Sequence, residues 1–177
     1  VGSVSDVGEQ TPSGTDATLS IPVSTAFSMK GEARYYSEEG TAVGSGPLPP
    51  QAGSTTTYVI EWFVNNTTND VENFSVTATI PKNVFWPGTD VQASAGDLTF
   101  DPVTREVRWT SNTVPTGAGS LSQTLTAHFT VRITPTAADV GSTPVLVDAA
   151  QFTGKDTHTK ETVGGSVASM TTDLLFD

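Results

Sequence analysis

The sequence predicts an all-β sandwich of about seven to nine strands, preceded by an extended N-terminal segment. Short stretches alternate apolar and polar residues and are rich in β-branched and aromatic side chains, which is the signature of strands. Turn signals separate these stretches at intervals typical of sandwiches. No stretch has a convincing helical period, and only Ala137–Val140 is expected to form a single helical turn.

The first part of the chain combines a linker with a candidate strand. Residues 1–18 are rich in Gly, Ser, Thr and Asp, and we interpret them as a linker or extension. Residues 19–26 follow with apolar side chains at odd positions, but Pro22 cannot donate to a ladder and predicts an edge strand or a break. Phe27–Tyr36 is a predicted strand. Because the sequence starts with Val1 instead of Met, we expect a processed or fragmentary mature chain.

Residues 55–81 predict two strands joined by a polar turn. In the first strand Tyr58, Ile60 and Trp62 share one phase, and we predict that they form the sandwich interior. In the second, apolar residues alternate with polar ones from Phe74 to Ile80. The stretch Asn65–Asp70 between them has turn chemistry. The sequence therefore predicts a hairpin here.

Prolines and glycines divide the rest of the chain. The predicted elements are an irregular connection at Gly44–Ser54, a hairpin at Asp97–Trp109, strands at Thr124–Ile133 and Pro144–Gly154, and a short strand ending near Val163. Trp86 is predicted to close one end of the core. Because Gly164-Gly165-Ser166 interrupts the strand pattern, we predict a sandwich over residues 19–163 and a separate C-terminal segment at 164–177.

Composition and charge exclude several classes of function. The 177 residues carry 19 acidic and 8 basic side chains, a net charge of -11, so a nucleic-acid partner and an anionic membrane surface are disfavoured. Cysteine is absent, which rules out disulfides and thiol chemistry. No apolar run approaches the ~20 residues that span a bilayer. The charged share of 15% and the many Ser and Thr residues are typical of sheet proteins outside cells.

Several motifs together resemble the immunoglobulin-like repeat domains of bacterial and archaeal cell-surface proteins. The matching residues are Thr57-Tyr58-Val59-Ile60, Asn66 with Asn69, Ile80-Pro81, and the stretch from Asp101 to Trp109. A version in large surface proteins of uncultivated bacteria also carries Tyr35-Tyr36, Gly46-Pro47-Leu48-Pro49-Pro50 and an ending near Thr172-Asp173-Leu174. The resemblance covers about residues 27–174. It implies an immunoglobulin-like sandwich, an extracellular setting at the cell surface, and a structural or adhesive role without catalytic residues.

The sequence contains no motif of a catalytic or cofactor site. Gly-x-Ser-x-Gly, His-Glu-x-x-His and phosphate-loop patterns are absent, and neither His128 nor His158 has a serine or carboxylate placed beside it by the sequence. Carboxylates with calcium chemistry occur at Asp97 with Asp101, Asp156 with Glu161, and Glu38 with Glu39. None of these pairs has the dense alternation of a calcium loop. We therefore expect no enzyme activity, no metal and no cofactor, with solvated loop carboxylates.

Two kinds of covalent modification are open to this sequence. Asn65, Asn66 and Asn73 each begin an Asn-x-Ser/Thr acceptor, and the first two lie in the predicted turn, where they are expected to be accessible. A Lys–Asn or Lys–Asp crosslink requires a buried lysine, whereas Lys30 has the outward phase of its strand. We therefore expect glycan acceptors and no internal crosslink. Asp148 is the carboxylate that can point inward, with a hydrogen-bonded role in a turn as the alternative.

The N-terminal segment suggests how such a domain assembles. Residues 19–26 read as a tethered, alternating strand that can add to the edge of a neighbouring sandwich, and the candidates are Leu19, Ile21, Val23 and Phe27. The alternative is that residues 19–23 pair within their own domain. The sequence thus favours a structural subunit of a surface filament that binds copies of itself by strand exchange. The second hypothesis is an adhesive or carbohydrate-binding repeat of a larger protein, with surface glycans as its partners.

Overall fold

The structure, a computed structural model, describes residues 21–174 and is built from strands and loops with one short 3-10 segment. The strands of five or more residues are β1 Phe27–Arg34, β2 Thr56–Asn66, β3 Val71–Thr79, β6 Asp97–Asp101, β7 Glu106–Val114, β8 Leu125–Ile133, β10 Ala150–Asp156 and β11 Thr162–Val167. The shorter elements are β4 Val84–Phe85, β5 Gln92–Ala93, β9 Val145–Val147, β12 Met170–Thr171 and the 3-10 segment η1 Ala137–Asp139. The helical turn predicted at Ala137–Val140 is confirmed by η1.

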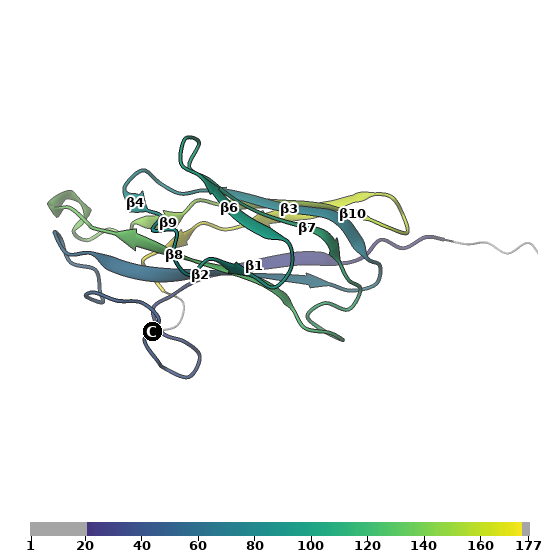
Figure 1. The fold of residues 1–177 in the computed structure, drawn as a ribbon, viewed down its shortest axis with the longest axis horizontal. Helices are drawn as coiled ribbons and strands as arrows, with labels where there is room; N and C mark the ends of the chain where they lie inside the picture. Colours follow the sequence, from purple (N-terminus) through teal and green to yellow (C-terminus); the bar gives the residue numbers. More distant parts are fainter. Residues whose placement is uncertain (1–20, 175–177) are drawn as a thin grey trace, which may run out of the picture.

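Two antiparallel five-stranded sheets face each other (Figure 1). The first has the order β1-β2-β8-β4, with β5 also pairing with β8, and the second has the order β11-β10-β3-β7-β6. The short strands β9 and β12 form a separate pair. The predicted all-β, immunoglobulin-like sandwich is therefore confirmed.

The predicted hairpin at residues 55–81 is wrong, although both of its strands exist. β2 pairs with β1 and β8, whereas β3 pairs with β7 and β10 in the opposite sheet. The turn Asn65–Asp70 therefore crosses from one sheet to the other. Two strands that are adjacent in sequence can lie in different layers, because each turns its apolar side chains toward the same core, one from each side.

The core lies between the two sheets and contains the residues predicted for it. Tyr58, Ile60 and Trp62 are fully buried on β2. The Trp62 ring packs edge-on against Phe129 with centroids 5.3 Å apart, and on the other sheet Phe74 packs against Trp109 at 5.1 Å. The prediction for Trp86 also holds, because its ring stacks on Phe100 at 4.9 Å and lies at the same distance from Phe129.

The sandwich continues past the C-terminal limit predicted from the glycines. β11 includes Gly164 and Gly165 and pairs with β10 along its length, so the boundary expected at Val163 lies inside a strand. At Gly164 a side chain would collide with the backbone oxygen of Phe152, which explains the glycine. β12 then pairs with β9 and buries Met170.

The strand predicted at Pro144–Gly154 is divided in two. β9 ends at Val147, and the backbone N–H of Asp148 donates to the carbonyl of Thr79 at 2.9 Å before β10 begins. Asp148 itself is exposed, so the prediction that it points inward is wrong. The buried carboxylates of the described residues are Glu32 and Asp156.

The described chain begins and ends at opposite ends of the long axis (Figure 1). We call one end the N-terminal pole, formed by Thr25 and the turns Asn65–Asp70 and Asp156–Lys160. The other end is the C-terminal pole, formed by the loops Leu48–Ala52 and Pro135–Pro144 with Thr172 and Asp173. β2 runs from one pole to the other, from Thr56 opposite Ile133 to Asn66 opposite Phe27.

Candidate functional site

Thr25 anchors the N-terminal segment to the sandwich. Its hydroxyl donates to Oδ1 of Asn66 at 2.6 Å and accepts the backbone N–H of Thr68 at 2.9 Å. Its own backbone N–H donates to Oδ2 of Asp156 at 2.7 Å. Asn66 belongs to the first sheet and Asp156 to the second, so Thr25 joins both layers at the N-terminal pole.

Asp156 is the centre of this anchor. Its carboxylate is buried and accepts hydrogen bonds from Nδ2 of Asn69 and from the backbone N–H groups of Thr25, His158 and Thr159. Burial alone raises the pKa of Asp156, but these hydrogen bonds outweigh it and hold the pKa far below that of an ordinary aspartate. The charged carboxylate is therefore a structural group that shapes the pole.

Asn66 and Asn69 explain the polar turn that the sequence singled out. Nδ2 of Asn66 donates to the carbonyls of Asn69, Val114 and Pro115 at 2.7, 3.1 and 3.0 Å. Nδ2 of Asn69 also donates to the carbonyl of Val23 at 2.8 Å, which holds the segment two residues before Thr25. The two side chains thus fix the turn that crosses between the sheets, and Asn69 also holds the N-terminal segment at Val23.

Beyond Thr25 the chain leaves the sandwich with apolar side chains exposed. Ile21 is 72% exposed and Val23 65% exposed, and residues 21–26 form no strand (Figure 1). The alternative that this part of the segment pairs within its own domain is therefore wrong for residues 21–23. Phe27 differs, because it begins β1 and packs against Phe74 and Phe152 with centroids 5.9 and 5.6 Å away. Phe27 is half-buried and packs against the core of its own domain, and both Leu19 and the linker 1–18 lie outside the described residues.

The three glycan acceptors differ in accessibility. Asn66 is fully buried and its amide nitrogen is engaged as described, so its expected accessibility is wrong. Asn65 is half-buried on β2, and its Oδ1 lies 3.5 Å from the hydroxyl of Thr124. Asn73 is exposed at a bulge of β3 with a φ of 55°. Asn73 and Asn65 remain the candidates, with Asn73 the more open.

The C-terminal pole carries a groove of about 680 Å³, which we call the C-pole groove. Its apolar lining comes from Leu48, Pro49, Pro50, Pro135, Val140 and Pro144. The backbone N–H of Gly53 donates to the carbonyl of Pro135 at 2.8 Å, and that of Thr172 to the carbonyl of Pro144 at 3.0 Å. These bonds tie the loops to one another, so the groove is formed before anything binds.

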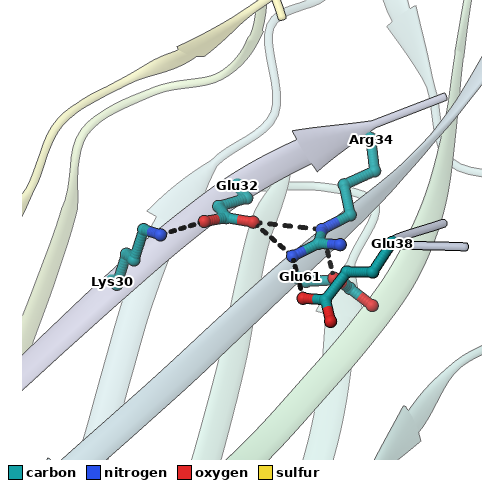
Figure 2. Close-up of polar contacts among 5 residues, drawn as sticks. All are labelled: Lys30, Glu32, Arg34, Glu38 and Glu61. Atoms are coloured by element: carbon teal, nitrogen blue, oxygen red, sulfur yellow. Dashed lines mark hydrogen bonds and ion pairs between the residues drawn. The ribbon is translucent and has the colours of Figure 1, made fainter. Parts of the chain in front are cut away.

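A second feature, a charged network, lies on the outer face of β1 and β2 (Figure 2). Glu32 and Glu61 are directly opposite in the strand register, and Arg34 separates them. Nη2 of Arg34 lies 2.6 Å from Oε2 of Glu32, and its Nε lies 2.7 Å from Oε2 of Glu61. Lys30 also pairs with Glu32, and Glu38 from the following loop reaches Nη2 of Arg34 at 3.1 Å.

Burial distinguishes this network from an ordinary surface ion pair. The side chain of Glu32 is only 4% exposed although it has the outward phase of β1, and it lines one groove together with Tyr36, Ser37 and Glu38 of the following loop. Burial raises the pKa of Glu32, but hydrogen bonds from Lys30 and Arg34 outweigh it and lower the pKa below the ordinary value. Lys30 itself is exposed, as its phase predicts.

Beside the network lies a groove of about 820 Å³ that we call the face groove. Its lining combines Arg34, Glu38 and Asn65 with the aromatic rings of Tyr36 and Phe63. The Arg34 guanidinium lies 6.0 Å from the centroid of Phe63. Aromatic rings beside planar polar groups can bind flat polar ligands.

Asp101 and His128 have local partners outside this network. Oδ1 of Asp101 accepts the backbone N–H of Val103 at 2.8 Å, and Nε2 of His128 lies 3.4 Å from Oδ1 of Asp90. Asp97, Glu39 and Glu161 are exposed. Among residues 21–174 no group of three His, Asp or Glu side chains is placed to hold a metal ion. Within the same range, no helix is long and apolar enough to cross a membrane.

Comparisons with known proteins find similarity only among solved structures. No family model and no curated protein matches the sequence. The chain is similar to the full-length major pilin SpaD from Corynebacterium diphtheriae, at 17% identity and a TM-score of 0.46 over 81% of this chain and 34% of that chain. It is similar to BcpA, the major pilin subunit of Bacillus cereus, at 10% identity and a TM-score of 0.49 over 82% and 40%. A GH20 exo-β-N-acetylglucosaminidase from Vibrio harveyi also matches, at 10% identity and a TM-score of 0.38 over 88% and 19%. The chain spans less than half the length of each of these proteins.

Sequence reasoning found the polar turn and the apolar segment but missed what joins them. Thr25 carried no signal, because its partners Asn66 and Asp156 lie 41 and 131 positions away. The burial of Glu32 was also missed, since its outward phase on β1 predicts an exposed side chain. The one signal for this anchor in the sequence was the pair Asn66 and Asn69, because asparagines in a turn often form side-chain hydrogen bonds to the nearby backbone.

Proposed function

We propose that this chain is a non-enzymatic, extracellular structural subunit of a cell-surface filament or appendage. Its copies bind one another head to tail by exchange of the N-terminal segment between sandwich domains. The observation that carries the proposal is the anchored segment at the N-terminal pole, where Ile21 and Val23 are exposed beyond a rigid attachment at Thr25. Burial of the exposed Ile21 and Val23 side chains by a neighbouring copy is energetically favourable.

Two further features support head-to-tail exchange. The segment leaves one pole, whereas the C-pole groove lies at the opposite pole. A contact between copies therefore joins two different surfaces, and the same contact can repeat along a filament. β1 pairs only with β2, and β11 pairs only with β10, among the strands that the structure describes. Both are edge strands, which are one kind of surface that can receive an exchanged segment.

The test removes residues 1–23 and leaves Ser24 and Thr25 in place. Because Thr25 keeps its bonds to Asn66 and Asp156 and only the exposed bond from Asn69 to Val23 is lost, we expect the shortened chain to fold with a slightly lowered unfolding midpoint and to remain monomeric. Electron microscopy should show filaments for the full chain and isolated particles for the shortened one. Filaments of the shortened chain would contradict segment exchange.

The face groove favours a second candidate function, an adhesive or carbohydrate-binding module. Tyr36, which is 40% exposed, and Phe63 offer ring faces to a sugar, with Arg34 and Glu38 beside them. Glycan binding that is lost in Tyr36→Ala, with a Tyr36→Phe control that keeps the ring, would favour this function. Unchanged glycan binding by Tyr36→Ala would exclude the face groove as the binding site.

A further inference from the structure

We propose that the C-pole groove of one copy binds Ile21 and Val23 of the next copy. This inference rests on the proposed function and names the receiving surface for the N-terminal segment. The groove lies at the C-terminal pole, between the loops Leu48–Ala52 and Pro135–Pro144.

The reach of the segment selects this surface. Ile21 lies four positions before the anchor at Thr25, and an extended chain over four positions spans at most ~14 Å. The sandwich is longer, because the eleven residues of β2 cover roughly 33 Å from pole to pole. When two copies are stacked end to end, Ile21 and Val23 therefore meet the facing pole, and the middle of either edge strand is beyond their reach.

The chemistry of the two surfaces agrees. Val140, at the rim of the groove, is 76% exposed, so a large apolar side chain is open to solvent on each surface. Burying such side chains against one another is favourable. Pro22 has no N–H, and the prolines lining the groove have none either, so side chains rather than a ladder carry this contact.

The groove is also rigid in the absence of a partner. The Gly53–Pro135 and Thr172–Pro144 backbone bonds join its walls. Oδ2 of Asp139 accepts the backbone N–H and the hydroxyl of Thr136 at 2.7 and 2.8 Å, which fixes the η1 turn beside Val140. A rigid groove and a segment anchored two residues from Val23 lose little conformational freedom on binding.

The test uses full-length chains with one charge introduced on either surface. Val23→Asp and Val140→Lys should each raise the dissociation constant for self-association by about tenfold or more, measured by sedimentation velocity. Val103→Lys is the matched control, because Val103 is a 90% exposed valine outside the groove. This control should associate like the unaltered chain. Circular dichroism and thermal unfolding should show all three variants folded.

Mixing the variants gives a sharper result. A Val23→Asp copy has an intact groove and a Val140→Lys copy has an intact segment, so the mixture should form dimers at a concentration at which each variant alone is monomeric. If Val140→Lys associates as well as Val103→Lys while Val23→Asp does not, the groove is the wrong surface and the proposed function stands. If Val23→Asp and the chain lacking residues 1–23 both assemble normally, or the unaltered chain never self-associates, the proposed function fails and the groove contact fails with it.

Discussion

The backbone N–H of Thr25 lies 2.7 Å from Oδ2 of Asp156, a residue 131 positions further along the chain. This bond closes the N-terminal pole, because Asp156 sits at the end of β10 and Thr25 lies two residues before the start of β1. The same carboxylate holds Asn69, and Asn69 in turn holds the carbonyl of Val23. The pole is thus a single hydrogen-bonded unit built from three distant parts of the chain.

Replacing Thr25 by valine should destabilise the domain. The change keeps the side-chain shape but removes the donor to Oδ1 of Asn66 and the acceptor of the Thr68 N–H. A buried polar group left without its partner costs about 1–3 kcal/mol, and we expect the free energy of unfolding in urea to fall by that amount. Ser24→Ala, which removes an exposed bond to Thr159, is the control and should have little effect. Equal stabilities of the two variants would contradict the anchor.

Acid should weaken the domain through Asp156. Its pKa is lower in the folded protein than the ~3.9 of an unfolded aspartate, so the folded state binds fewer protons. The stabilisation is complete above about pH 4 and is lost as the pH falls toward the folded pKa.

Thermal unfolding followed between about pH 2 and pH 7 tests this dependence. Asp156→Asn should have a lower midpoint than the unaltered chain at neutral pH and a shallower decline in acid. Asp148→Asn, at an exposed carboxylate, should retain the original pH profile. A steep acid decline that persists in Asp156→Asn would assign the effect to other groups.

Removing the cation of the charged network should be costly. Arg34→Met leaves Glu32 buried with only Lys30 as its cation and leaves Glu61 directly opposite it. Loss of one partner of a buried ion pair typically costs about 3–5 kcal/mol, and urea denaturation should show a loss near the lower limit. Arg108→Met breaks the exposed pair with Glu106 and should cost less than about 1 kcal/mol. Adding Glu32→Gln to Arg34→Met should restore part of the stability, since no buried charge then remains at that position.

Glycan attachment, where it occurs, should follow side-chain accessibility. In native material we expect sugar on Asn73 and none on Asn66, because Asn66 is fully buried and donates to three carbonyls. Peptide mapping by mass spectrometry locates the modified residue, and Asn73→Gln should remove that mass. A native mass equal to that of the bare chain would leave all the acceptors unmodified, and a glycan on Asn66 would contradict the fold at this turn.

Local patterns were enough to predict the strands and much of the core. Alternation identified β2, β3 and β8, and the phase of β2 correctly assigned Tyr58, Ile60 and Trp62 to the interior. Alternation does not say which strands pair, because both faces of a sandwich use the same period. That is why β2 and β3 were predicted as a hairpin although they lie in different sheets.

The candidate site was less predictable than the fold. Exposed Ile21 and Val23 could be recognised as a candidate assembly segment from their alternation and from Pro22. The anchor at Thr25 and the groove beside Val140 arise from contacts between residues far apart in sequence, and no local signal marks them. Gly164 misled the prediction, because glycine serves here for the close approach of β10 and β11 instead of ending the fold.

The attachment of Thr25 to both sheets has a mechanical consequence. A pulling force on residues 21–24 reaches Asn66 in the first sheet and Asp156 in the second at the same time. We expect the tension to be shared between the layers, so that strands must shear together and no single strand is peeled from an edge. Single-molecule stretching from residue 21 should therefore give a lower rupture force for Thr25→Val than for the unaltered chain, with Ser24→Ala unchanged.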